Sequence, residues 1–99
     1  MTREEILAAA KQCVCGDRDQ DYGSPETSFN MIAALWEPYI REKCVNPDGD
    51  VCITGADVGA MMALFKIARI ATGHGKADNW IDLAGYAACG GELEDVWNY

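Results

Sequence analysis

The sequence predicts an all-α fold in which four main helices form a compact bundle, as a single domain over residues 1–99. Apolar residues recur at steps of three and four along most of the chain, the spacing that places them on one side of a helix. Ser, Thr, Asp, Pro and Gly stand at helix-start and helix-stop positions between these stretches. No stretch alternates apolar and polar residues convincingly, so 51–53 is expected to be an isolated extended piece at most.

The first two helices have clear start signals. Thr2–Glu5 fits a capping box, and apolar residues follow at helical spacing until Gly16. Residues 17–23 are too polar and irregular for a core, so we expect a loop there. Ser24 as N-cap and Pro25 at the first helical position open the second helix. Its regular apolar stripe consists of Phe29, Ile32, Ala33, Trp36, Tyr39 and Ile40.

The third helix is the most apolar part of the chain. The segment 41–53 leads into it, and Asn46–Asp50 is expected to be a solvated turn, since the later ligands of a calcium loop are missing. Thr54–Asp57 forms a second capping box. The helix from about 55 to 71 is apolar on nearly all sides, which places it at the centre of the fold or at a subunit contact.

The fourth helix is expected to begin at Asp78 and to break at Gly90-Gly91. Residues 92–99 then form a short turn or a tail. Its apolar side carries Trp80, Ile81, Ala84, Ala87 and Ala88. Another side carries Asp78, Asp82 and Tyr86 at four-residue steps.

Composition excludes several classes of protein. The net charge of −8 disfavours general binding to nucleic acid, which needs a basic surface, and adhesion to an anionic membrane. No segment has the length of a membrane span, and the N-terminus lacks signal-peptide features, so we expect a cytoplasmic protein. Its five cysteines are then free thiols, and their spacing does not favour a zinc site. We expect no resident metal or cofactor.

Lys66 and Arg69 are the sharpest candidates for chemistry, because they are two cations on an otherwise apolar helix. Packing of the last two helices is expected to bring them near the stripe of Asp82 and Tyr86. One interpretation is a structural ion pair between Lys66 or Arg69 and Asp82. The other is a ligand site in which the cations hold phosphate oxygens and an acid holds a hydroxyl, a base edge or Mg²⁺.

The loop before the second helix is a second candidate. Gly23 indicates a tight turn, and the N–H groups at the start of the following helix favour anions. Arg18 and Tyr22 would then reach a ligand. The alternative is a plain acidic loop with Tyr22 packed on the core.

Six short motifs in a fixed order resemble a small uncharacterised family of helical phage and prophage proteins. The motifs are Gly16-Asp17-Arg18, Asp21-Tyr22-Gly23, Asn30-Met31-Ile32-Ala33-x-Leu35-Trp36, Ile53-Thr54-x-x-Asp57-Val58, Lys66-Ile67-Ala68-Arg69 and Asp78-x-x-x-Asp82-x-Ala84-Gly85-Tyr86. The chain is also similar to the phage nucleotide-modification-associated helical domain. These resemblances imply a phage protein, acting in the infected bacterial host, with a connection to nucleotides.

A more distant similarity is to the all-α nucleoside triphosphate pyrophosphohydrolases, the MazG-like group. Those enzymes hold Mg²⁺ with four carboxylates on two helices, and this chain departs from that pattern. Glu37 and Glu42 do not share a helix face, and Asp78 with Asp82 supplies only one pair. Mg²⁺ therefore enters only in a hydrolase alternative, in which a partner subunit adds the missing acids.

The preferred hypothesis is a non-catalytic protein that binds a nucleotide or cyclic-nucleotide-like molecule and sequesters a nucleotide-derived immune signal of the host. The alternatives are the hydrolase and an interaction protein without a nucleotide ligand. We also expect a homo-oligomer, a dimer or larger, through apolar residues such as Met61, Met62 and Phe65. The candidate ligand-binding residues are Arg18, Tyr22, Asn30, Lys66, Arg69, Asn79, Asp82 and Tyr86.

Overall fold

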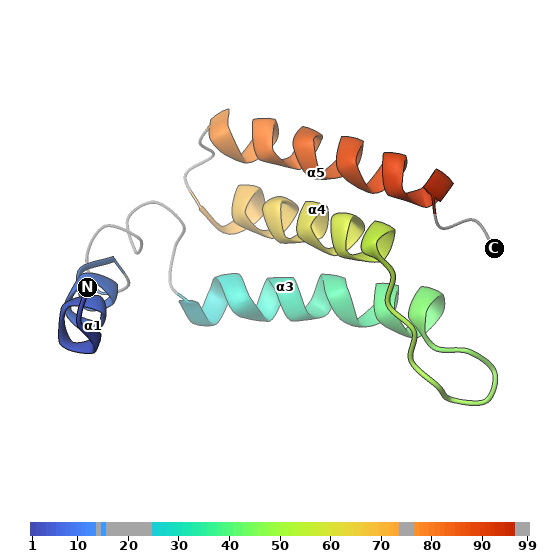
Figure 1. The fold of residues 1–99 in the computed structure, drawn as a ribbon, viewed down its shortest axis with the longest axis horizontal. Helices are drawn as coiled ribbons and strands as arrows, with labels where there is room; N and C mark the ends of the chain where they lie inside the picture. Colours follow the sequence, from blue (N-terminus) through green and yellow to red (C-terminus); the bar gives the residue numbers. More distant parts are fainter. Residues whose placement is uncertain (14, 16–24, 74–76, 97–99) are drawn as a thin grey trace.

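The computed structural model describes residues 1–13, 15, 25–73 and 77–96, and these residues form an all-helical fold (Figure 1). The prediction of an all-α fold with four helices is confirmed. The described part contains no strand, only an isolated antiparallel bridge between Val45 and Val51. The helices are α1 (Arg3–Gln12), α3 (Pro25–Tyr39), α4 (Gly55–Thr72) and α5 (Ala77–Val96), with one π-helical turn, η2 (Ile40–Cys44), after α3.

Three of the helices form a layer with α4 in the middle (Figure 1). α4 packs on α3 and on α5 and runs antiparallel to both, which agrees with the central position predicted for it. α1 lies apart from this layer and buries none of its residues. The radius of gyration is 16.1 Å, against about 13 Å for a compact chain of 100 residues. The arrangement is therefore more extended than the compact bundle that the sequence predicts.

The helix starts agree with the capping signals where the structure describes them. The Thr2 hydroxyl accepts a hydrogen bond from the backbone N–H of Glu5 at 3.2 Å. Thr54 and Asp57 form the predicted capping box at the start of α4. The predicted loop 17–23, the Ser24 cap, and with them the candidates Arg18 and Tyr22, lie outside the described residues.

α3 changes character at its C-terminal end. Pro38 lies inside the helix and has no N–H to donate to the carbonyl of Ala34, which interrupts the regular hydrogen bonding. The turn that follows is π-helical and ends at Cys44. The chain then makes the predicted turn, in which the Asn46 side chain accepts hydrogen bonds from the backbone N–H groups of Asp48 and Asp50 at 3.0 and 2.9 Å.

α4 and α5 meet through residues that have almost no side chain. A Cβ added to Gly59 would lie 2.8 Å from the Cα of Gly90, so the two backbones are in direct contact. The predicted break at Gly90-Gly91 is wrong, because α5 continues through both glycines to Val96. Each glycine costs the helix about 1 kcal/mol in propensity relative to Ala. The close approach requires glycine at Gly59 of α4, whereas a Cβ at Gly90 would lie 3.4 Å from the Cα of Gly59, an ordinary van der Waals contact.

The inward side of α5 is not the side that the sequence marks as apolar. Asn79 and Gly90 are buried towards α4, whereas Trp80 and Ile81 are 59% and 66% exposed. The apolar stripe of α5 therefore points away from the layer. Met61, Met62 and Phe65 of α4, expected to be the uncovered apolar groups, are only partly exposed, because α3 and α5 flank that helix on both sides.

A buried carboxylate joins the end of α3, the η2 turn and the start of α4. Asp57 is 2% exposed. Its Oδ1 accepts a hydrogen bond from the Tyr39 hydroxyl at 2.8 Å and lies 3.4 Å from the ammonium Nζ of Lys43. Its Oδ2 accepts hydrogen bonds from the backbone N–H and the hydroxyl of Thr54 at 2.9 and 3.0 Å. We call these four residues the Asp57 cluster.

The Asp57 cluster holds this carboxylate in its charged form. Burial alone would raise the pKa of Asp57, but the hydrogen bonds from Thr54 and Tyr39 and the charge of Lys43 outweigh it and lower the pKa to about 2. Burial, followed by the Asp57 carboxylate, raises the pKa of the Tyr39 phenol. The phenol therefore stays protonated and keeps donating its hydrogen bond at neutral pH.

Acid should weaken the fold through Asp57. The folded-state pKa lies below the unfolded value of 3.8, so this stabilisation is present above pH 3.8 and is lost as the pH falls towards 2. The shift corresponds to about 2 kcal/mol of unfolding free energy. Asp57→Asn should remove this part of the pH dependence in urea unfolding between pH 5 and 2. The exposed Asp48→Asn is the control and should keep it; an unchanged profile in Asp57→Asn contradicts the assignment.

The contact between α4 and α5 should tolerate no added methyl group at its closest point. Gly59→Ala is expected to lower the unfolding free energy by about 1–3 kcal/mol, because the new Cβ overlaps the Gly90 backbone. Gly85→Ala is the matched control on α5, where an added Cβ meets nothing within 4 Å. It should stabilise the protein by about 0.5–1 kcal/mol. Thermal unfolding of both variants checks this, and a stabilising Gly59→Ala would contradict the packing.

Candidate functional site

Two cations of α4 lie at the ring of Phe65. The guanidinium carbon of Arg69 is 4.3 Å from the ring centroid, and Nζ of Lys66 is 5.6 Å from it. Arg69 follows Phe65 by one helical turn, the spacing at which side chains on a helix meet. Stacking on the negative face of the ring favours both cations. The two candidate residues are therefore brought together around one aromatic side chain.

Lys66 also forms an ion pair with α5. Its Nζ lies 3.0 Å from Oδ2 of Asp82, and the Lys66 side chain is buried whereas that of Asp82 is 49% exposed. This is one of the two arrangements that the sequence left open, a structural pair between the third and fourth helices. A buried ammonium needs such a partner whatever else it does. The exposed half of the Asp82 carboxylate leaves the pair accessible from solvent.

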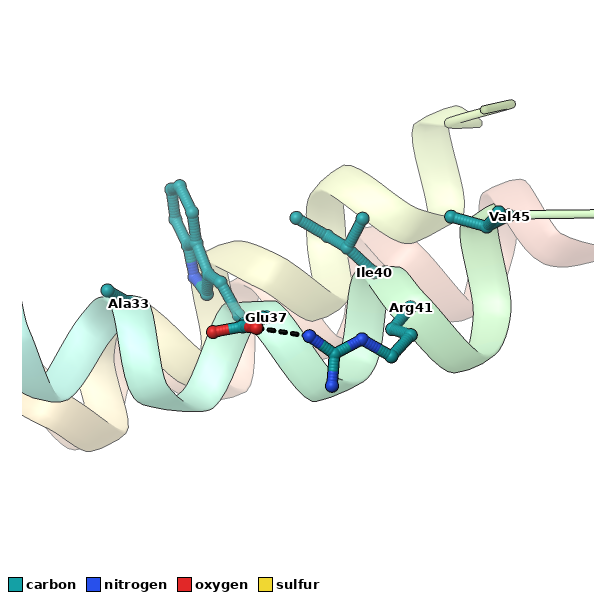
Figure 2. A pocket seen from close by; sticks show the side chains of 6 residues that line it. Ala33, Glu37, Ile40, Arg41 and Val45 are labelled. Carbon is teal, nitrogen blue, oxygen red and sulfur yellow. Dashed lines mark hydrogen bonds and ion pairs between the residues drawn. The ribbon is translucent and has the colours of Figure 1, made fainter. Parts of the chain in front are cut away.

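Beside Phe65, α3 carries two adjoining apolar hollows that share Ala33 and Trp36. One has a volume of about 350 Å³ and is lined by Phe29, Ile32, Ala33, Trp36 and Phe65. The other, of about 590 Å³, is drawn in Figure 2 and is lined by Ala33, Trp36, Glu37, Ile40, Arg41 and Val45. We call the two hollows together the α3 groove.

Polar contacts fix parts of the α3 groove. The indole N–H of Trp36 donates to the carbonyl oxygen of Met61 at 2.7 Å, which ties α3 to α4. Figure 2 shows Glu37 paired with Arg41 at the rim of the larger hollow. The groove therefore has an aromatic side chain anchored to α4 on its inner side and an exposed ion pair at its rim.

The other candidates that the structure describes, Asn30, Asn79 and Tyr86, do not join this site. Tyr86 lines a separate hollow of about 330 Å³ that also includes Tyr39 and Glu94. Asn79 is buried in the first turn of α5. Asn30 is exposed on α3, two residues from the buried Ile32 and hence on the opposite side of the helix. The structure thus assembles Lys66, Arg69 and Asp82 from the predicted set.

The sequence analysis did not identify the contacts of the Phe65 ring with two cations or the hydrogen bond of the Tyr39 hydroxyl to Asp57. Phe65 was assigned to the apolar surface, although its four-residue spacing from Arg69 is a readable signal for a cation over a ring. Tyr39 belongs to the apolar stripe of α3, and nothing local indicates that its hydroxyl meets Asp57. That contact joins residues 18 positions apart and depends on how α3 and α4 pack.

The hydrolase alternative would use Asp78 and Asp82 of α5, together with acids from a partner subunit. Asp82 is paired with Lys66, and Asp78 is exposed in the first turn of α5. Within the residues that the structure describes, no group of three or more His, Cys, Asp or Glu side chains is placed to hold a metal ion. In the same residues, no helix combines the length and apolar character needed to span a membrane.

Comparison with known proteins places the chain among phage sequences. It is 37% identical over 87 residues to the Gene 55 protein of Mycobacterium phage D29, an alignment that covers 87% of this chain and 51% of that protein. It is 39% identical over 82 residues to the Gene 55 protein of Mycobacterium phage L5, covering 83% and 47%. The chain therefore spans about half the length of these curated relatives. No solved structure matches it. Residues 5–94 match the model of a family described as a domain of unknown function, DUF6378, and the chain belongs to that family.

Proposed function

We propose that this phage-related chain binds a nucleotide without transforming it, at the junction of the Phe65 cations and the α3 groove. One observation carries the proposal. The ring over which Arg69 and Lys66 lie is the same ring that closes the smaller hollow of the α3 groove. Two cations suited to phosphate and an aromatic wall are thereby adjacent.

The chemistry of the two parts matches the two parts of a nucleotide. A guanidinium donates paired hydrogen bonds to phosphate oxygens, and an ammonium adds a point charge. Phe29, Trp36 and Phe65 line the hollow, and aromatic rings stack on bases of any sequence. Its volume of about 350 Å³ lies within the range of small-molecule sites.

Sequestration of a nucleotide-derived immune signal of the host is the biological role that we attach to this binding. It is supported by the kinship with phage proteins and by the resemblance to the phage nucleotide-modification-associated domain. The second candidate is an interaction protein without a nucleotide ligand. The Lys66–Asp82 pair favours it, because that pair satisfies both charges without a ligand.

We further propose that the protein is a homo-oligomer, and that the outward side of α5 is the contact surface. Trp80 and Ile81 are large, apolar and mostly exposed on that side, and a contiguous apolar patch on a small domain marks a contact surface. A second copy related by a twofold axis would cover both stripes at once.

Nucleotide binding is tested by incubating the protein with a panel of linear and cyclic nucleotides, with and without Mg²⁺. We expect one class to be depleted from solution and recovered intact after heating. Arg69→Ala and Lys66→Ala should each weaken binding at least tenfold, since a charge-assisted contact is worth about 1.5–3 kcal/mol. Arg3→Ala, which removes an exposed cation of α1, is the control and should bind normally.

The other outcomes separate the alternatives. Hydrolysed nucleotides in the supernatant would support the hydrolase alternative. If every nucleotide stays in solution unchanged, the result supports an interaction protein without a nucleotide ligand. If the Arg69→Ala and Lys66→Ala variants are folded and bind nucleotide as tightly as the parent protein, the assignment of the binding site to Phe65 and its cations is wrong. Circular dichroism of each variant distinguishes lost binding from lost structure.

Association through α5 is tested by light scattering at micromolar concentration. We expect a mass at least twice the 10.8 kDa of one chain, and Trp80→Lys or Ile81→Lys should reduce it to that of one chain by placing a charge in the contact. Val51→Lys is the matched control, because Val51 is 62% exposed but lies in the loop before α4. A parent protein of 10.8 kDa would overturn the assignment.

A further inference from the structure

The backbones of Cys44 and Cys52 are paired at the two ends of the loop between η2 and α4. The backbone N–H of Cys52 donates to the carbonyl oxygen of Cys44 at 2.7 Å, next to the bridge between Val45 and Val51. In a regular antiparallel pair, opposed residues that exchange both N–H···O bonds have Cα atoms about 5.5 Å apart, and Cys44 and Cys52 make one of these two bonds. Disulfides join Cα atoms separated by about 4.4–6.8 Å, and this backbone pairing is compatible with such a separation. The Cys52 thiol is also close enough to Cys44 to influence its pKa.

The two thiols differ in access. Cys52 is exposed, whereas Cys44 is 2% exposed. Burial, and next the neighbouring Asp57 carboxylate, raise the pKa of the Cys44 thiol, and the charge of Lys43 opposes this only in part. A reagent in solution therefore meets Cys52 first. Cys13, Cys15 and Cys89 are exposed as well, which makes them internal references for simple surface reactivity.

We propose that Cys44 and Cys52 form a reversible disulfide by exchange with a low-molecular-weight disulfide. The Cys52 thiolate attacks one sulfur of the reagent, and the other half of the reagent leaves as a thiol. Cys44 then gives up its proton to water and attacks the Cys52 sulfur, which releases the second half as a thiol. Two protein thiols are oxidised to one disulfide, and the reagent is reduced by two electrons to two thiols.

This cross-link would act next to the Asp57 cluster. Cys44 adjoins Lys43, which pairs with Asp57, and Cys52 lies two residues before Thr54, which caps α4. A covalent link between them fixes the loop to the end of η2 and restricts the unfolded chain. The oxidised protein should therefore melt at a higher temperature than the reduced one. This modification is independent of nucleotide binding.

The test uses the full chain with Cys13, Cys15 and Cys89 replaced by Ser, incubated with glutathione disulfide. We expect intact mass spectrometry to show a monomeric chain lighter by two hydrogen atoms, and peptide mapping to join Cys44 to Cys52. Dithiothreitol should restore the starting mass and the lower melting temperature. In the same background, Cys44→Ala should instead keep a glutathione adduct at Cys52.

Three results would overturn the proposal. They are a stable glutathione adduct on Cys52 while Cys44 is intact, a disulfide that joins two chains, and two thiols that stay free under conditions in which Cys89 of the unsubstituted protein reacts. Circular dichroism of the reduced variant shows that the tested chain is folded, so a missing disulfide counts against the geometry. Cys52→Ser should be unreactive, because the remaining thiol is buried.

Discussion

The charged carboxylate of Asp57 is the constraint on which the layer of helices depends. It receives hydrogen bonds or charge from the end of α3, from η2 and from the residue that caps α4. A buried carboxylate without these partners would be costly, so the fold requires the three segments to meet there. Once they meet, the axes of α3 and α4 are fixed relative to each other. The Trp36–Met61 hydrogen bond then follows further along the same pair of helices.

The contact between α4 and α5, on the other side of α4, depends on small residues and not on a buried charge. Gly59 and Gly90 let α4 and α5 approach until their backbones touch, and one consequence is the burial of Lys66 under α5, where Asp82 neutralises it. The close contact also turns small and polar residues of α5 inward, so that Trp80 and Ile81 face out. The layer is thus held by one polar cluster and one seam of small residues, and the apolar stripe of α5 remains on the outside. This is the physical basis for the proposed self-association.

The sequence predicts the parts of this fold that depend on local chemistry. The Thr2 cap of α1, the Thr54–Asp57 capping box and the extent of α4 follow from residues within a few positions of each other, and the structure agrees with them. At α1 the structure shows the Thr2 half of the predicted capping box, the hydrogen bond from the Glu5 N–H. The predicted helix break at Gly90-Gly91 was wrong because Gly90 packs against Gly59 of α4. Gly59 lies 31 positions earlier in the chain, so local sequence does not indicate this contact. The same limit applies to Asp57, which local reasoning identifies only as a capping residue. Its meeting with Tyr39 and Lys43 requires the tertiary arrangement.

In the candidate site, too, the sequence predicts the residues identified by local spacing but not those brought together by helix packing. Two cations on an apolar helix identified Lys66 and Arg69, and the spacing of the acids on the next helix identified Asp82 as a partner. The aromatic wall could not be predicted in this way, because Phe29 and Trp36 come from α3 and Phe65 from α4.

Direct titration of the Asp57 carboxyl by NMR is the measurement that tests the account at its centre. A sample labelled at aspartate carboxyl carbons gives the pKa of this residue in the folded protein. The Asp57 cluster predicts a value of about 2, below the unfolded value of 3.8, with the chemical shift unchanged from pH 7 to pH 4. A value at or above 3.8 would contradict it, because the hydrogen bonds from Tyr39 and Thr54 would then not hold the charge that joins α3 to α4.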